Sequence, residues 1–335
     1  MPQVSVIMPS YNHGLYIAEA IRSVLTQSFT DLELIIIDDA STDNSPAIIR
    51  SLQQQDSRVK ATFHETNQLL AKTVNDGFAQ AQGQFLCILT SDDIYPQERI
   101  AHQVQLATQP ELRDKVIVGD YVNVDNDSNI VPDPFAGPTW NQYTLKRHGD
   151  ILESLLDLWM TYIGFQTLFL NQNHVAQVRF DERFPLISNE LKFALDLAGR
   201  FQFHKMDELV FIHRIHDQNL SRRGETDMEH LVMVDKEKRI IAQDMLAQHP
   251  HRLPASIRAK LQQFIMSCSE SYGNPAVDKQ YFLDFLRHHP SALNATRAAV
   301  KTLPTNRIPY PFRKDNTQLT LAEIGISVQD IMQMG

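Results

Sequence analysis

The first 125 residues alternate between short apolar runs and segments in which apolar side chains recur every three or four positions. Continuous apolar runs are typical of buried strands, and the three-and-four spacing is typical of helices. We expect strands at residues 4–8, 32–37, 59–64, 85–89 and 116–124, and helices at 15–27, 45–54, 70–82 and 96–108. This alternation predicts an α/β fold, a mostly parallel sheet with helices on both faces.

Capping residues and helix breakers mark several of these boundaries. Ser45 followed by Pro46 is typical of a helix start, with the serine as N-cap and the proline in the first turn. Pro96 is expected to open another helix and Gly83 to follow the end of the helix over 70–82. Ligands of such sheets bind where the strands end, so polar residues that directly follow a strand are the first candidates for function.

The alternation weakens after about residue 150 and becomes helical after about residue 225. One strand is expected over 209–213. Apolar residues at helical spacing predict helices over 227–248, 255–268, 281–303 and 321–334, and residues 302–314 are expected to be irregular. The sequence therefore predicts a helical region behind the α/β part.

Residues 151–170 are apolar on average, yet they do not fit a membrane span. Glu153 and Asp157 lie inside the segment and residues 164–166 interrupt it, whereas a spanning helix needs about 20 apolar residues with few charges. We predict a buried helix followed by a strand. The N-terminus has no basic lead before a long apolar core, so we expect no secretory signal and a cytoplasmic location.

Composition and charge narrow the class of protein further. Hydrophobic residues make up 43% of the 335 residues and charged residues 21%, as in ordinary globular proteins. The formal net charge of −9 argues against a general nucleic-acid binder, which needs a basic face. Cys87 and Cys268 are too far apart for a paired metal motif and too few for a disulfide framework, so reduced thiols are expected.

Polar clusters follow three of the predicted strands: Pro9-Ser10-Tyr11-Asn12, Asp38-Asp39 and Thr90-Ser91-Asp92-Asp93. Each cluster alone is compatible with a helix cap or a solvated turn, and Asp43 is expected to have only such a role. Asp39 and Asp92 facing one crevice would repel each other, so a cation is expected between them. Mg²⁺ or Mn²⁺ shared with phosphate oxygens suits carboxylate ligands.

These segments resemble the family 2 glycosyltransferases, which have the GT-A fold. The resemblance is strong in VSVIMPSYN, AEAIRSVLTQSFTDLELIIIDDASTDNS and GQFLCILTSDDIYPQERI, and continues more weakly to about residue 223 through FDERFPLISNELKFALDLAG and FIHRIHDQNLS. Within this family, the quoted segments are closest in style to the bacterial polysaccharide and spore-coat enzymes. It implies inverting transfer of a sugar from a nucleoside-diphosphate donor, UDP-linked, to a hydroxyl of a glycan or lipid-linked acceptor in cell-surface polysaccharide synthesis.

The resemblance also implies a domain organisation. Residues 1–224 are expected to form the GT-A domain, with a nucleotide-binding half over 1–125 and an acceptor and catalytic half over 126–224. Residues 225–335 are expected to form a helical C-terminal region, which lies beyond the resemblance and is compatible with a homodimer or a docking role.

Donor-binding roles follow from the same resemblance. Asp39 is expected to accept a hydrogen bond from the base, with Tyr11 stacking nearby and Pro9 shaping the turn. Asp38 is expected to fix the loop or reach the ribose. Lys72 is expected to contact a phosphate or the ribose, or to be a solvated helix residue.

The Asp-x-Asp metal motif of the family falls on Thr90-Ser91-Asp92, so its first aspartate is missing. Its last aspartate is the usual metal contact, which makes Asp92 the expected ligand and places Ser91 at the nucleotide. His216 lies in a segment similar to the family's Tyr-Arg-x-His and is expected to be a metal or phosphate ligand, or a structural histidine.

Four further residues are expected near the sugar or the acceptor. Arg214 is expected to act as an electrostatic clamp or as a structural partner. Asp93 is expected to contact sugar hydroxyls or to cap the helix that Pro96 opens. Trp140 is expected to offer a stacking platform on the acceptor side, as is Trp159, for which core packing is the alternative.

The resemblance places the catalytic base at Glu190. Inverting transfer is a single displacement in which one carboxylate takes the proton of the attacking hydroxyl, and a cation stabilises the leaving group. The family has its base in a Glu-Asp or similar pair at the start of a helix, and here that pair is Asn189-Glu190. The alternative is that Glu190 is only a favourable charge at a helix N-terminus.

Two other functions stay open beside the transferase. A nucleotidyltransferase would need a Gly-rich basic loop after the first strand, which the sequence lacks, and a catalytically silent GT-A module would only bind a nucleotide or a partner. A basic, aromatic segment near the C-terminus is either an exposed loop or a peripheral contact with the inner face of the membrane. Its residues are Lys301, Arg307, Tyr310, Phe312, Arg313 and Lys314.

Overall fold

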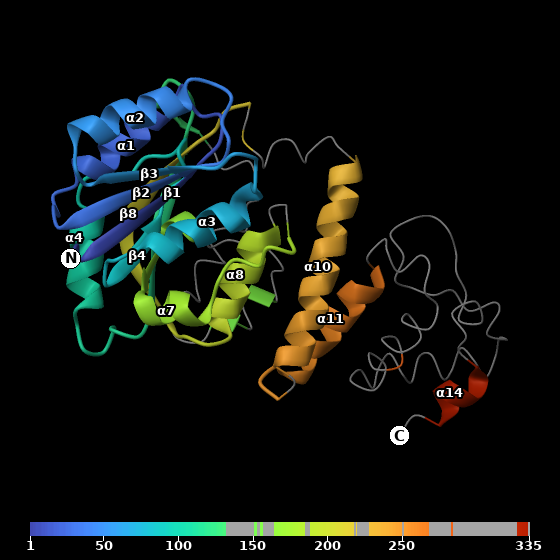
Figure 1. The fold of residues 1–335 in the computed structure, drawn as a ribbon. Helices are drawn as coiled ribbons and strands as arrows, with labels where there is room; N and C mark the ends of the chain where they lie inside the picture. The colour runs from blue at the N-terminus through green and yellow to red at the C-terminus, as the bar shows by residue number, and fades with distance from the viewer. Residues whose placement is uncertain are drawn as a thin grey trace. The chain divides into compact units, whose positions relative to one another are not determined.

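The computed structural model describes residues 1–131, 151–152, 155–156, 164–184, 188–217, 219, 228–249, 251–267, 283 and 327–333. Contacts within the chain divide it into two compact units. The first contains residues 1–155 and 159–223, and the second contains residues 156–158 and 224–335. The sheet lies in the first unit (Figure 1).

Four parallel strands form the N-terminal half of the sheet, in the order β3-β2-β1-β4. Their bounds are β1 Val4–Ser10, β2 Leu32–Asp38, β3 Val59–Phe63 and β4 Phe85–Ile88. Every residue of β1, β2 and β4 is buried, because helices cover both faces. The predicted parallel, doubly covered sheet is confirmed for this half.

The other half of the sheet mixes directions. Strand β7 (Leu168–Asn171) runs antiparallel to both β4 and β5 (Val116–Val124), and β6 (Ile130–Val131) is antiparallel to β5. Strand β8 (Phe203–Arg214) pairs parallel with β5. It is much longer than the strand expected over 209–213, because its first half carries polar, partly exposed residues that hide the apolar signal.

Helices α1 (Ile17–Leu25), α2 (Ser45–Gln55) and α4 (Arg99–Ala107) pack on one face of the sheet. Helix α3 (Leu69–Gln80) packs on the other face, and Figure 1 shows the strands between α3 and the pair α1 and α2. A Cβ on Gly77 of α3 would lie 2.3 Å from the Cγ2 of Ile7, so this position needs glycine for α3 to approach the sheet so closely. Helices α7 (Gln172–Gln177) and α8 (Ser188–Ala198) and the short 3₁₀ helix Phe165–Thr167 complete the described part of this unit.

Two helix starts differ from the prediction. Ser45 does not cap α2: its Oγ has no hydrogen-bond partner, while the carboxylate of Asp43 accepts from the Ser45 N–H at 2.9 Å. Helix α4 begins at Arg99, three residues after Pro96. Arg99 is buried and donates to the carbonyl oxygens of Val210 (2.9 Å) and Leu168 (3.3 Å), which fastens this helix start to the sheet.

The second unit is helical where it is described, with α10 (Met228–Gln248), α11 (Ala255–Ser267) and α14 (Val328–Met332). Helices α10 and α11 pack against each other. The helix expected over 281–303 and the basic segment over 302–314 lie outside the described residues apart from residue 283. Among the helices that the structure describes, none combines the length and the apolar character that crossing a membrane requires.

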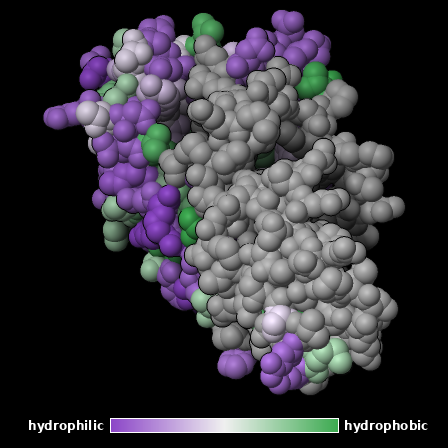
Figure 2. All heavy atoms as spheres, turned by 90° about the vertical axis from the view of Figure 1, so that its right-hand side faces the viewer, coloured by the Kyte–Doolittle hydropathy of each residue, from purple (hydrophilic) through white to green (hydrophobic). Residues whose placement is uncertain are grey.

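The surface of the described part is ordinary in polarity. On the face drawn in Figure 2, its residues are mainly hydrophilic and the hydrophobic ones are separated. Large exposed apolar side chains such as Leu15, Leu69 and Ile130 come from different elements, and isolated apolar residues are normal on protein surfaces.

The buried carboxylate of Glu33, near the start of β2, joins this strand to β1, to β3 and to the segment after α3. Glu33 of β2 accepts from the Ser5 Oγ (2.6 Å), the Gln82 N–H (2.8 Å) and the Lys60 Nζ (2.5 Å). Burial raises its pKa, but these three donors outweigh burial and leave the pKa of Glu33 below its ordinary value. The native state therefore favours the ionised form.

Replacing this carboxylate should lower stability and change its dependence on pH. Because the folded-state pKa of Glu33 is lowered, its contribution is complete above the unfolded value and is lost as pH falls through the folded value. We expect Glu33→Gln to lower the free energy of unfolding by about 1–3 kcal/mol at neutral pH, and to lose less stability than the native chain on acidification. Urea unfolding at several pH values measures this, with exposed Glu111→Gln as the control; equal losses in both variants would contradict it.

Candidate functional site

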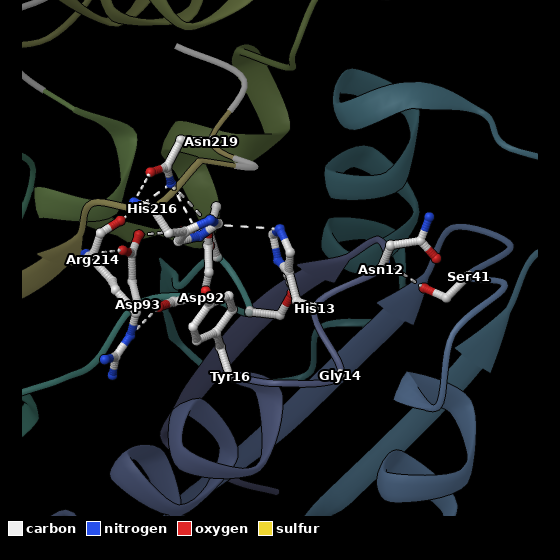
Figure 3. A network of polar contacts seen from close by, with 12 residues as sticks. Asn12, His13, Gly14, Tyr16, Ser41, Asp92, Asp93, Arg214, His216 and Asn219 are labelled. Atoms are coloured by element: carbon white, nitrogen blue, oxygen red, sulfur yellow. Dashed lines mark hydrogen bonds and ion pairs between the residues drawn. The ribbon is translucent and has the colours of Figure 1, made fainter. Parts of the chain in front are cut away.

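The loops after β1, β2 and β4 meet at the carboxyl edge of the parallel strands. The loop after β1 contacts both neighbours. Asn12 donates its N–H to the Ser41 Oγ at 2.9 Å and accepts from the Thr42 N–H at 2.8 Å, and the next residue, His13, reaches Ser91 and Asp92 (Figure 3). The polar clusters that the sequence singled out therefore gather around one edge, as parallel strands require.

The carboxylate of Asp92 lies between two histidines. The Nε2 of His216 is 3.2 Å from its Oδ2, and the Nε2 of His13 is 3.6 Å from the same oxygen. The other ring nitrogen of His13, Nδ1, is 2.8 Å from the buried Oγ of Ser91, which orients the ring. His216 and Asp92 come from loops 124 residues apart in sequence, and both are buried.

The segment after β8 is tied to Asp92 and Asp93 through several contacts. Asp93 Oδ1 accepts from the Arg214 N–H at 2.9 Å, and the Asn219 amide donates to Asp92 Oδ2 at 3.3 Å. The Asn219 Oδ1 accepts from the His216 N–H at 2.6 Å. The chain after β8 is thereby folded back onto the loop after β4 (Figure 3).

Helix α1 supports this arrangement from the side. The ring of Tyr16 stacks on the ring of His216, with 4.5 Å between the centroids and 24° between the planes. The Arg214 guanidinium lies 5.4 Å from the Tyr16 ring centroid and donates to the Glu19 carboxylate at 2.6 Å. Arg214 is thus a structural partner in this state, while its charge stays within the site.

The pKa values of the two adjacent aspartates are shifted in opposite directions. Burial raises the pKa of Asp92, but the hydrogen bond from His216 and the charges of His13 and His216 outweigh it and leave the pKa lowered. Burial and the neighbouring Asp92 charge hold the pKa of Asp93 well above its ordinary value. Oppositely shifted pKa values in one crevice are typical of functional sites.

His13, Asp92 and His216 fit a divalent cation. One ligand atom from each lies within 4.8 Å of the other two. Metal–ligand bonds of about 2.1 Å at right angles place ligand atoms about 3 Å apart, close to the 3.2 Å and 3.6 Å separations from Asp92 to the two histidines. Nitrogen and carboxylate donors together suit transition-metal ions such as Mn²⁺. Thr90, at the first position of the motif, is not part of this cluster, and both histidines come from other loops.

The aspartates after β2 have different neighbours. Asp38 accepts from the N–H (3.0 Å) and Oγ (2.7 Å) of Ser41, so it fixes its own loop in this state, and burial raises its pKa. Asp39 accepts from the N–H groups of Gln68 (2.7 Å) and Leu69 (2.9 Å) at the start of α3, and its Oδ1 is 2.7 Å from the Nδ1 of His64. Asp39 is buried and is oriented by three contacts.

The remaining donor-site candidates line the same edge. Pro9 lies buried near the end of β1, and Tyr11 directly beyond β1 is exposed. Lys72 on α3 is paired with Asp76 one turn along the helix and is 39% exposed, so its ammonium is accessible to a ligand. Their roles in binding a nucleotide stay predictions.

Glu190 lies in the first turn of α8. Burial raises the pKa of its carboxyl to about 8, and it forms no hydrogen bond or ion pair with the residues that the structure describes. A carboxylate that retains its proton near neutral pH is a stronger base once deprotonated. Trp140 and Trp159 lie outside the described residues.

One expectation for Asp93 is wrong. It does not cap the helix after Pro96, because α4 begins at Arg99 and the Asp93 oxygens are used by the Arg214 N–H and the Thr90 hydroxyl. Asp93 is buried, and its contact with sugar hydroxyls stays a prediction.

Sequence reasoning missed several residues of this site. His13 follows directly on the Pro9–Asn12 cluster, and His64 follows β3. Both would have been found by examining the polar residues after every strand and by extending each cluster by one residue. Asn219 lies three residues after His216 and carries no comparable signal. Tyr16 was indistinguishable from an ordinary helix-start residue.

Comparisons with known proteins agree with this architecture. The profile of "Glycosyl transferase family 2" matches residues 5–171. A glycosyltransferase of Haemophilus influenzae is 40% identical over 131 residues, which are 39% of this chain and 52% of that protein. A Campylobacter jejuni GalNAc(5)-diNAcBac-PP-undecaprenol β-1,3-glucosyltransferase is 37% identical over 94 residues, 28% of this chain and 30% of that protein. The chain thus spans about half, or less, of the length of these relatives.

The fold is also found among solved structures. The S. aureus TarS structure in complex with UDP-GlcNAc matches with a TM-score of 0.58 and 20% identity, covering 88% of this chain and 83% of TarS in that crystal. The mixed sheet, the helices on its two faces and these similarities agree on the GT-A fold. With the profile match over residues 5–171, they make the chain a member of glycosyl transferase family 2.

Proposed function

We propose that the protein is an inverting glycosyltransferase that moves a sugar from a UDP-linked donor to a hydroxyl of a glycan or lipid-linked acceptor. The observation that carries this proposal is the His13–Asp92–His216 cluster at the carboxyl edge of a family 2 sheet. It is a cation site at the edge where a nucleoside diphosphate binds in such sheets. The TarS complex with UDP-GlcNAc supports a UDP-sugar donor.

In this proposal the acceptor hydroxyl attacks the anomeric carbon as the bond from that carbon to the diphosphate oxygen breaks. Glu190 takes the hydroxyl proton, so one bond forms, one breaks and the proton ends on the carboxylate. Asp39 orients the base, with Tyr11 and Pro9 beside it. Lys72, whose partner Asp76 also contacts His64 beside Asp39, adds positive charge for a phosphate.

His13, Asp92 and His216 would hold the Mn²⁺ or Mg²⁺ ion. A divalent ion bound there supplies positive charge to the departing diphosphate. The Arg214 guanidinium donates to the backbone carbonyl oxygen of Asp92 at 3.3 Å and adds a positive charge near the cluster. Its pairing with Glu19 keeps it in place. Ser91 holds the His13 ring in the orientation that the cluster needs.

The polysaccharide role, the location and the partners belong to the same proposal. The relative named for an undecaprenol-linked acceptor supports acceptors that are themselves lipid-linked. A cytoplasmic protein at the inner face of the membrane would meet both such an acceptor and a nucleotide-sugar donor. A homodimer through the helical region is compatible with this role, and the acidic net charge disfavours nucleic acid as a partner.

A catalytically silent GT-A module is the second candidate. Thr90 at the first position of the metal motif, and a Glu190 carboxyl whose pKa of about 8 leaves it mainly protonated at neutral pH, favour it. Such a module would bind a nucleotide or partner and turn over no donor.

Nucleotide binding should be UDP-selective and metal-dependent. We expect calorimetric titration with UDP, GDP, dTDP and CDP to show strongest binding to UDP with Mn²⁺. Asp39→Ala should abolish binding with and without the metal, because the base contact is lost. Asp92→Asn should remove only the response to Mn²⁺, since it loses the charged ligand. Exposed Asp127→Asn is the matched control; a folded protein that binds none of the four nucleotides would rule out the transferase proposal.

Turnover should depend on a deprotonated Glu190. Because the raised pKa of about 8 leaves the carboxyl protonated below that value, we expect kcat/KM to rise with pH up to about 8. Glu190→Gln should lower kcat by about 100-fold or more while leaving UDP affinity unchanged. Glu208→Gln, an exposed glutamate of β8, is the control. Full turnover by Glu190→Gln would exclude this residue as the base, and binding without turnover of any donor would favour the silent module.

A further inference from the structure

His64, the residue after β3, bridges two carboxylates on different elements. Its Nδ1 is 2.7 Å from the Oδ1 of Asp39, at the end of β2, and its Nε2 is 3.1 Å from the Oδ2 of Asp76, on α3. The His64 side chain is 12% exposed and that of Asp39 is 5% exposed. The ring thus connects the predicted base-binding aspartate to the helix that covers this face of the sheet.

The two contacts define the protonation of the ring. A carboxylate offers only acceptors, and a neutral imidazole has one N–H donor and one bare lone pair. If the ring were neutral, one of its lone pairs would face a carboxylate oxygen at hydrogen-bond distance, which is repulsive. With both carboxyls ionised, the two contacts are both hydrogen bonds only when both ring nitrogens carry protons.

The other charged groups around the ring come from three elements. Lys72 on α3 pairs with the other carboxylate oxygen of Asp76, Oδ1. Asp38 offers its backbone oxygen to the His64 N–H at 2.8 Å and turns its carboxylate to Ser41. Glu65, next in the chain, is exposed, and Arg50 of α2 lies over the ring of Phe63. The two carboxylates within hydrogen-bond distance are therefore the main influence on the ring charge.

Asp39 depends on this ring for its orientation. The N–H groups of Gln68 and Leu69 approach its two oxygens from the start of α3, and His64 approaches Oδ1 from the end of β3. A carboxylate has about four acceptor positions, so three contacts fix the group and leave one position for a ligand donor. Leu69 has a left-handed backbone, with φ at 68°, which is uncommon for a branched side chain.

We propose that His64, as an imidazolium, is a positioning residue that holds Asp39 in the orientation that receives the base of a nucleoside diphosphate. This rests on the proposed function, which places the base at Asp39. When the ring loses the Nδ1 proton, its contact with Asp39 becomes repulsive, and the carboxylate is held only by the N–H groups of Gln68 and Leu69. Nucleotide affinity therefore falls as His64 deprotonates, independently of the metal cluster.

Two substitutions separate the charge of the ring from its bulk. His64→Asn places an amide N–H near the position of Nδ1 and does not titrate, whereas His64→Ala removes both donors. UDP binding without metal is measured for each variant between about pH 6 and about pH 9, the range in which histidine changes charge. The ratio of the variant Kd to the native Kd at each pH cancels the titration of the phosphate and of the other histidines.

We expect His64→Ala to bind UDP about tenfold more weakly than the native protein at the acid end, with the ratio approaching one at the alkaline end. His64→Asn should bind with native affinity at the acid end and more tightly than the native protein at the alkaline end. A Kd ratio for His64→Ala that is the same at every pH would mean that the ring acts through its bulk and not through its charge, and it would overturn the proposal. Circular dichroism of each variant checks that it is folded.

A second measurement keeps this inference separate from the proposed function. In ¹⁵N-histidine-labelled protein without nucleotide, the His64 resonances, identified by their loss in His64→Asn, should show both ring nitrogens protonated at about pH 6.5. Asp76→Asn should move loss of the second proton to lower pH. A singly protonated ring at that pH overturns the proposal even if UDP binds. Absence of UDP binding with a doubly protonated ring would instead reject the nucleotide site and with it the ligand named here.

Discussion

The site depends on two adjacent buried carboxylates, Asp92 and Asp93, in the loop after β4. Between them they accept from the backbone N–H of Arg214 and from the side chain of Asn219, and Asp92 contacts His216. Buried carboxylates are costly unless donors surround them, so this pair holds the end of β8 against the middle of the sheet. The pairing of β8 with β5 and the bridge between Ile94 and Ile212 bring the strand to this place, and the two carboxylates fix the segment that follows it.

The same segment contributes to the cluster of His13, Asp92 and His216, whose geometry fits a divalent cation. Thr90 stands where the family has its first aspartate, and its hydroxyl bonds Asp93 instead. The other two members of the cluster come from elsewhere, because His13 lies on the loop after β1 and His216 on the segment after β8. A site assembled from three loops depends more on the packing of those loops than a site that lies within one motif.

Sequence patterns predicted the parallel half of the sheet well, because buried parallel strands such as β1 and β2 are uninterrupted apolar runs. They located β8 only in part, since residues such as Lys205 and Asp207 make its first half polar. The antiparallel insertion of β7 between β4 and β5 has no local signature at all. At the site, the polar residues after the strands included Asp39 and Asp92, and the same search after β3 would have found His64. Asn219, which donates to Asp92, is placed by long-range packing that the local sequence does not encode.

The loop after β1 has a mechanical consequence. Asn12 is tied to the loop after β2, and His13, its immediate neighbour, is tied to the loop after β4. Consecutive Cα atoms are about 3.8 Å apart, so a single peptide unit links the loop after β2 to the cluster of His13, Asp92 and His216. A displacement of one of these regions is therefore passed to the other through the backbone between Asn12 and His13.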